Sequence, residues 1–320
     1  MESRENPIYG RKIFFLNMPF NIKKLIIGKL QELEYEVYLI NDYKNAKNIL
    51  RHYSDSICFV DIDSTQENKL SVQQWFYFLK SFDFDKQLKT IYIGVLSGHV
   101  SKADRTYFML HASFPAGFIT LNQPIEDLTQ IIIGILEING AKGRRKYVRA
   151  KCRPEAQARI QCRIDEKEYA LPIIDISSIG LSCSIPVSYC DKFPPNTVLR
   201  NARIFFGIRQ VQCSAAVLMQ KQLSPTKYSL ILLYLQSTLF SVRNAIRQYV
   251  FRTLNQDVID TIKNEKPDTE TYTTAPFEKS EEAFLLNEDE DQKGEKEASP
   301  ETNDDSYSGT ADDLVITNLF

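Results

Sequence analysis

Two short stretches of the sequence carry side chains that could bind a nucleotide. One is the basic segment AKGRRKYVR at 141–149, and the other is DISSIGLS at 175–182. An arginine fork donates paired hydrogen bonds to a phosphate or to a base edge, and its flat guanidinium stacks on rings. Carboxylate and hydroxyl oxygens add acceptors, and glycine permits a close backbone approach. The residues that carry this chemistry are Arg144, Arg145, Arg149, Asp175, Ser177 and Gly180.

Neither pattern is specific when it stands alone. Arg-x-x-x-Arg recurs at 149/153, 159/163 and 243/247, and Asp-x-Ser-x-x-Gly recurs as DDSYSG at 304–309. Each also has an ordinary explanation, since the arginines could belong to a solvated linker and the second motif could close a hairpin with a glycine at positive φ. Their order is more informative, because the arginines directly precede a run of strand-like segments and the turn motif starts 26 residues after Arg149.

Residues 150–235 contain six strand-like segments separated by turns, with no helical pattern, which predicts a small antiparallel barrel. The segments are ARIQCRI, EYALPIIDI, GLSCSI, ARIFFGI, VQCSAAVLM and YSLILLYLQ. A long amphipathic helix is expected over 237–262, with Ser237 as its N-cap. Its predicted apolar stripe is Leu239, Val242, Ala245, Ile246, Tyr249 and Val250.

The arrangement of basic linker, strands, turn motif and long helix over 141–264 resembles the PilZ domain, a family of receptors for the second messenger cyclic di-GMP. The resemblance implies that Arg145 and Arg149 bind the guanine bases or phosphates of this ligand. It also implies that Arg144 favours a stacked ligand dimer. PilZ proteins act in motility, exopolysaccharide production and virulence, and the sequence does not choose among these processes.

The same resemblance assigns the turn motif to the ligand. It implies that Asp175 accepts hydrogen bonds from the N1 and N2 edge of guanine, that Ser177 bonds a base or phosphate, and that Gly180 lets the backbone turn tightly beside the ligand. We expect a switch in which the arginine linker is loosely held without ligand and closes on the barrel when cyclic di-GMP binds. Closure would change the orientation of the two domains or the binding of a partner.

Residues 11–140 alternate strand-like and helical patterns five times, which predicts a parallel sheet covered on both faces. This α/β pattern resembles the receiver domain of response regulators, although another doubly wound domain would show a similar alternation of strands and helices. The expected strands are 12–17, 36–40, 56–62, 90–96 and 116–121, and the expected helices are 22–33, 43–53, 71–80, 102–111 and 124–138.

The receiver-like domain lacks part of the usual phosphorylation chemistry. A receiver has an acidic pair after its first strand, an acceptor Asp after the third, Ser or Thr after the fourth and Lys after the fifth. Without paired carboxylates Mg²⁺ is held poorly, so we expect a pseudo-receiver that dimerises or docks a protein partner. The corresponding residues here are Asn17 and Met18 for the acids, Asp61 or Asp63 for the acceptor, Ser97, and Gln123 for the lysine.

Charge divides the chain into a basic body and an acidic tail. Residues 265–320 hold 17 acidic and 4 basic side chains, whereas residues 1–264 hold 24 acidic and 35 basic ones. The sequence therefore predicts a receiver-like domain at 1–140, a PilZ domain at 141–264 and a disordered acidic tail at 265–320. The basic body suits an anionic ligand. A nucleic-acid-binding regulator is an alternative, although no helix-turn-helix or RNA-binding strand motif is present, and a ligand-independent adaptor is another.

Other chemistry has little support in the sequence. The six cysteines form no Cys-x-x-Cys pair, and Cys183 and Cys213 fall in strand-like segments as small apolar residues. No zinc spacing, nucleophile elbow or phosphate loop occurs, so we expect no metal, no cofactor and no enzymatic activity. No apolar run reaches the roughly 18 to 20 residues of a membrane span, and we expect a cytoplasmic protein that does not insert into membranes.

Overall fold

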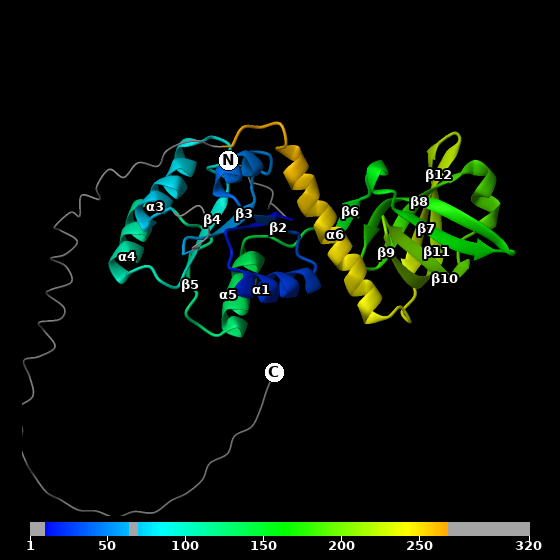
Figure 1. Ribbon diagram of the computed structural model, residues 1–320, viewed down its shortest axis with the longest axis horizontal. Helices are drawn as coiled ribbons and strands as arrows, with labels where there is room; N and C mark the ends of the chain where they lie inside the picture. Colours follow the sequence, from blue (N-terminus) through cyan, green and yellow to red (C-terminus); the bar gives the residue numbers. More distant parts are fainter. Residues whose placement is uncertain (1–9, 64–69, 268–320) are drawn as a thin grey trace, which may run out of the picture. The chain divides into compact units, whose positions relative to one another are not determined.

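The computed structural model describes residues 10–63 and 70–267. The predicted acidic tail beyond residue 267 and the second Asp-x-Ser-x-x-Gly match at 304–309 lie outside these residues. Figure 1 shows a sheet flanked by helices, formed by the N-terminal part, and a barrel formed by the later strands. Of the helices that the structure describes, none has the length and apolar character needed to cross a membrane.

The N-terminal sheet is fully parallel, with the strand order β2-β1-β3-β4-β5. This is the order of flavodoxin and CheY, so the predicted doubly wound, receiver-like architecture is confirmed. The strands are β1 (Ile13–Leu16), β2 (Val37–Ile40), β3 (Ile57–Asp61), β4 (Tyr92–Ser97) and β5 (Phe118–Thr120). The helices are α1 (Phe20–Glu32), α2 (Ala46–Arg51), α3 (Val72–Lys80), α4 (Lys102–His111) and α5 (Ile125–Ile138), with single turns η1 (Tyr43–Asn45) and η2 (Ser81–Phe84).

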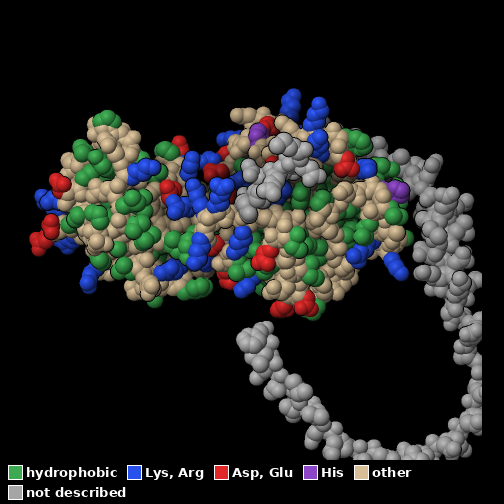
Figure 2. All heavy atoms as spheres, turned by 180° about the vertical axis from the view of Figure 1, so that it is seen from behind, with side chains coloured by type: hydrophobic (Ala, Val, Ile, Leu, Met, Phe, Trp, Pro, Cys, Tyr) green, Lys and Arg blue, Asp and Glu red, His purple; other side chains and the backbone are tan. Residues whose placement is uncertain are grey.

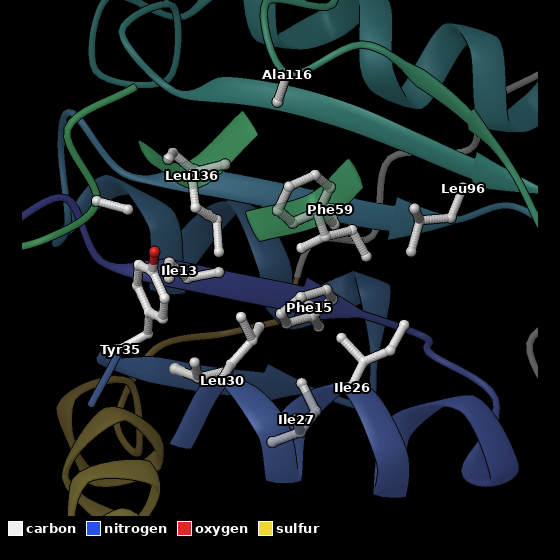
Figure 3. Close-up of a cluster of buried hydrophobic side chains, with 14 of the residues drawn as sticks. Ile13, Phe15, Ile26, Ile27, Leu30, Tyr35, Phe59, Leu96, Ala116 and Leu136 are labelled. Carbon is white, nitrogen blue, oxygen red and sulfur yellow. The ribbon is translucent and has the colours of Figure 1, made fainter. Parts of the chain in front are cut away.

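The central strands are apolar without alternation because helices cover both faces of the sheet. All of β1 and β3 is buried. On one face, Phe15 and Phe59 stack with ring centroids 5.2 Å apart, and they pack against Ile26 and Leu30 of α1 and Leu136 of α5 (Figure 3). This core fixes the strand ends and the α1–β2 connection, which matter below.

The second region is a closed antiparallel barrel of six strands in the order β8-β7-β10-β11-β12-β9, closed by the pairing of β8 with β9. The prediction of six strands is therefore confirmed. The barrel strands are β7 (Arg159–Ile164), β8 (Lys167–Ser177), β9 (Gly180–Pro186), β10 (Val198–Phe206), β11 (Arg209–Ser224) and β12 (Lys227–Tyr234), with single turns η3 (Pro154–Ala156) and η4 (Val187–Lys192).

Cysteines help to fill the barrel interior, as predicted. Cys183 in β9 and Cys213 in β11 are buried free thiols. Burial raises the pKa of both thiols, that of Cys213 to about 12. Because the reactive species of cysteine is the thiolate, these two side chains act as small apolar residues.

The basic linker contributes a strand that the sequence did not predict. Residues Arg149–Lys151 form β6, which pairs with β8 outside the closed ring. Its burial alternates, because Ala150 is fully buried and its two neighbours are exposed. The predicted linker 141–149 therefore ends inside the sheet.

The long C-terminal helix, α6, spans Phe240–Thr261. The predicted N-cap at Ser237 is wrong, since the helix begins after Leu239 with no side-chain cap. Arg243 instead donates hydrogen bonds to the carbonyls of Leu235 and Thr238. Of the predicted stripe, Leu239 is exposed. The buried face is made by Ile246, Val250, Phe251, Leu254 and Val258.

Helix α6 contacts both folded regions, which belong to one compact unit. It packs on β6, β8 and β11 of the barrel region and on β2 of the parallel sheet. Strand β2 is an edge strand, whose outward backbone groups need partners. Asn255 supplies one, because its Oδ1 accepts a hydrogen bond of 2.8 Å from the backbone N–H of Leu39. Its Nδ2 donates to the carbonyl of Phe251 at 2.8 Å.

We expect Asn255→Ala to expose this strand edge. The Leu39 amide loses its partner, so its hydrogen exchange accelerates and the free energy of unfolding falls by about 1–2 kcal/mol. Native-state hydrogen exchange and denaturant titration measure the two effects. The control is Gln248→Ala at an exposed position of the same helix, which should change neither. Equal exchange of Leu39 in both variants would contradict this role of Asn255.

Candidate functional site

The two predicted motifs meet through the pairing of β6 with β8. Arg149 lies opposite Ser177, and Lys151 lies opposite Asp175. Directly opposed residues in an antiparallel pair have Cβ atoms about 5 Å apart. The linker and the turn motif are thus brought to the same edge of the barrel by backbone hydrogen bonds, although 26 residues separate Arg149 from Asp175 in the sequence.

The three predicted linker arginines are available to a ligand. Arg144, Arg145 and Arg149 are exposed. Within residues 10–63 and 70–267, no hydrogen bond or ion pair engages their guanidinium groups. Figure 2 shows that Lys and Arg outnumber acidic side chains on the face in view, in agreement with a basic body. A ligand could bind these arginines without breaking an internal contact.

Apart from Arg149, which the match 149/153 shares, the arginines of the competing Arg-x-x-x-Arg matches already have partners. Those of helix α6 serve the fold, because Arg243 binds carbonyls before the helix and Arg247 pairs with Glu34. The others are Arg153, which pairs with Asp257 and Asp260, Arg159, which lies over the ring of Phe205, and Arg163, which donates to the carbonyl of Glu166. The structure therefore distinguishes 145/149 from the other matches by its unpaired charges.

Asp175 is half-buried and retains one carboxylate oxygen for a ligand. Its Oδ2 accepts a hydrogen bond of 2.7 Å from the hydroxyl of Ser182 on β9. The bond fixes the orientation of the carboxylate, and Oδ1 has no partner among the described residues. Ser182 lies within the same DISSIGLS stretch, but nothing in the sequence indicated that it would position Asp175.

Ser177 serves the turn in this structure. Its side chain is buried, and its hydroxyl donates to the carbonyl of Gly180 at 3.0 Å. Gly180 does not have the positive φ that a tight turn would require. Glycine is needed there for space, because a Cβ would lie 2.3 Å from the carbonyl oxygen of Leu232 on the paired strand β12. The predicted contacts of both residues with a ligand remain predictions.

Gly180→Ala should therefore damage the barrel. The added methyl forces β9 and β12 apart, and overpacking of this kind typically lowers the free energy of unfolding by about 1–3 kcal/mol. Denaturant unfolding of the purified variant measures the loss. The matched control is Gly134→Ala in α5, where a Cβ meets nothing within 4 Å and the helix gains up to about 1 kcal/mol. Comparable stability changes in the two variants would contradict the steric argument.

The acceptor position of the receiver-like domain is occupied by internal hydrogen bonds. Asp63 follows β3, and its Oδ1 accepts from the hydroxyl of Ser97 at 2.7 Å. Its Oδ2 accepts from the backbone N–H groups of Gly98 and His99. These donors satisfy both carboxylate oxygens and tie the ends of β3 and β4 together. Among the described residues, no cluster of three metal-ligating side chains occurs.

Asp61, the other acceptor candidate, is fully buried at the end of β3. Its Oδ1 accepts from the backbone N–H of Asp63 at 2.8 Å, and its Oδ2 has no hydrogen-bond partner. Burial raises the pKa of this carboxyl to about 7. A side chain enclosed in this way cannot reach a phosphodonor, so the structure supports the prediction of a pseudo-receiver.

Asp61 should make stability depend on pH. The unfolded carboxyl ionises near pH 4 and the folded one near 7, so the native state binds more protons between these values. The free energy of unfolding then falls as pH rises through this window, by up to about 1.4 kcal/mol per pH unit, and levels off above it. Asp61→Asn should flatten that slope, as measured by urea unfolding between pH 4 and 8. The exposed Asp127→Asn should leave the slope as in the wild type, and an unchanged slope in Asp61→Asn would refute the assignment.

A cavity of about 720 Å³ opens between α4 and β5, away from the predicted residues. Its lining mixes charged, polar and apolar side chains and includes none of the six residues of the linker and turn motif. The lining residues include Lys80, Asp83, Met109, Leu110, Phe114 and Phe118. The candidate site is therefore the basic surface beside β6 and not this cavity.

No protein-family model matches the chain, and no curated protein is similar to it in sequence. Solved structures show low similarity over parts of the chain. The complex of MrkH from K. pneumonia with c-di-GMP is 19% identical, with a TM-score of 0.32, over 38% of this chain and 56% of MrkH. The chain thus matches little more than half the length of MrkH.

The c-di-GMP-bound PilZ domain of YcgR from Escherichia coli is 14% identical, with a TM-score of 0.33, over 38% of this chain and 98% of that domain. The chemotaxis protein CheY4 of Vibrio cholerae is 18% identical, with a TM-score of 0.32, over 40% of this chain and 99% of CheY4. Because these TM-scores are low, the description of the two domains rests on their strand orders. The chain has a receiver-like parallel sheet followed by a closed antiparallel barrel of six strands.

Proposed function

We propose that this chain binds cyclic di-GMP on the surface formed by the linker arginines and the turn motif, and that binding changes the linker and so the surface offered to a protein partner. One observation carries the proposal. The β6–β8 pairing holds Arg149, whose exposed guanidinium has no partner among the described residues, on the same edge as the half-buried carboxylate of Asp175, and Arg144 and Arg145 precede it in the linker.

The chemistry of this surface complements the ligand. Cyclic di-GMP presents two phosphates and two guanine bases, and arginine forks bind phosphate oxygens or the O6 and N7 atoms of guanine. The free Oδ1 of Asp175 suits the N1 and N2 donors that distinguish guanine from adenine. Arg145 and Arg149 are assigned to direct contacts, and Arg144 to a second, stacked ligand molecule. Ser177 contributes by holding the turn, in addition to any contact of its own.

The effect on a partner follows from the position of the linker. Arg144 and Arg145 lie between the two folded regions, in a stretch that has no regular structure. A ligand that bridges these arginines to the barrel orders that stretch. The pseudo-receiver then provides a docking surface whose accessibility depends on the ligand, which makes the chain an effector and not a catalyst.

Calorimetry with cyclic di-GMP tests the site. The wild type should bind, and Arg145→Ala should lose most of the affinity because several charge-assisted contacts, each about 1–3 kcal/mol, act together. The control Arg209→Ala removes the same charge from an exposed position on β11 that has no partner among the described residues, and should bind as the wild type does. Cyclic di-AMP should compete poorly, since adenine lacks the N1 and N2 donors.

The remaining outcomes distinguish the alternatives. Binding of cyclic di-GMP that Arg145→Ala leaves intact would place the site elsewhere. No binding to the wild type would favour the ligand-independent adaptor. A salt-dependent shift of duplex DNA that is insensitive to cyclic di-GMP would favour the nucleic-acid-binding regulator.

A further inference from the structure

The turn that joins α1 to β2 in the pseudo-receiver contacts both segments of the candidate site, the linker and the turn motif. Its central residue, Glu34, has a φ of 60°. The Oε2 of Glu34 accepts a hydrogen bond of 3.0 Å from the backbone N–H of Val148, directly before Arg149. Its Oε1 accepts one of 2.7 Å from the hydroxyl of Ser178, inside the turn motif. One carboxylate therefore holds the linker and the barrel corner together.

The same carboxylate is paired with helix α6. Arg247 places its Nε and one terminal nitrogen each 3.4 Å from Oε1 of Glu34. Both side chains are largely buried, with 10% of Glu34 and 14% of Arg247 exposed. A buried charge is strongly destabilising when its partner is removed, so this pair holds Glu34 in place where it meets Val148 and Ser178.

The start of the linker is held by the same turn. The ammonium group of Lys142 donates to the carbonyl of Leu33 at 2.9 Å and lies 4.6 Å from the centre of the Tyr35 ring. Residues 33–35 thus anchor the linker at Lys142 and again at Val148. Between these anchors, residues 143–147 carry no hydrogen bond to the remainder of the described chain, and they include Arg144 and Arg145, which are assigned to the ligand. The linker is consequently more constrained than the loosely held segment that the sequence suggested.

We propose that Glu34 is a positioning residue of the cyclic di-GMP site, through which the pseudo-receiver pre-orders the arginine loop; this rests on the function proposed above. Immobilising side chains on binding costs conformational entropy, and a loop anchored at both ends has less entropy left to lose. The coupling is reciprocal, because a ligand that prefers the anchored loop also strengthens the hold of the loop on Glu34. The pseudo-receiver thereby senses whether the site is occupied without touching the ligand.

The first test is hydrogen exchange of the ligand-free full chain. Glu34→Ala should accelerate exchange of the Val148 amide at least tenfold, because that amide loses its acceptor. Glu34→Gln keeps a neutral acceptor oxygen and should give an intermediate rate. The control Glu32→Ala removes an exposed carboxylate from the end of α1, two residues before Glu34, where it pairs with Lys29, and should leave the rate unchanged. Unchanged exchange in Glu34→Ala would overturn the proposed anchor.

The second test measures affinity for cyclic di-GMP by calorimetry. Glu34→Ala should bind about tenfold more weakly than the wild type, and Glu34→Gln should recover part of the loss. A double-mutant cycle with Arg144→Ala separates positioning from general destabilisation. The combined loss should be smaller than the product of the single fold-changes, because Arg144 contributes less on an unanchored loop.

Should Glu34→Ala reduce stability too far for calorimetry, Ser178→Ala serves in its place. It removes one donor to Glu34 and leaves the pair with Arg247 intact, and it should weaken binding by a few fold. Wild-type affinity in all Glu34 and Ser178 variants, or fully multiplicative losses in the cycle, would overturn the positioning role while the proposed function stands. Absence of binding to the wild type would instead reject the proposed function, and the positioning role with it.

Discussion

The candidate site depends on the register of a three-residue strand. Strand β6 pairs with β8 so that Arg149 opposes Ser177 and Lys151 opposes Asp175. The side chains of a strand alternate between two faces, and a slip of one residue would turn every one of them over. Ala150 fixes the register, because it is fully buried while its neighbours are exposed. The buried Ala150 between two charged residues thus turns the side chain of Arg149 toward the surface and not into the core.

The charged side chains singled out in the two domains differ in their exposure and in their internal hydrogen bonds. In the pseudo-receiver, Asp63 is saturated by a hydroxyl and two backbone amides, and Asp61 is enclosed without a counter-charge. Both oxygens of Asp63 are hydrogen-bonded and the carboxyl of Asp61 is buried, so neither side chain is available to a substrate. The linker arginines have exposed guanidinium groups and no internal partner among the described residues. In the proposed function, the linker arginines and not the carboxyl edge of the parallel sheet bind the ligand.

The sequence predicted those features that local patterns determine. The continuous apolar runs of β1 and β3 and the alternation in the barrel strands identified both folds, and the order of the motifs predicted that the linker and the turn motif would lie together. Contacts between distant residues left no such pattern. Glu34 meets Val148 and Ser178 across 114 and 144 residues, and β6 is too short, at three residues, to show periodicity. Gly180 was assigned to a turn, whereas the carbonyl of Leu232 explains it.

Helix α6 joins these parts into one mechanical element. Arg247 on this helix pairs with Glu34, and two turns later Asn255 completes the exposed edge of β2, while the same helix packs on β6 and β8. A rigid helix carries a displacement along its whole length, so a shift of α6 relative to the parallel sheet would disturb both contacts together. The contacts of helix α6 therefore link the edge of the pseudo-receiver sheet to the candidate site.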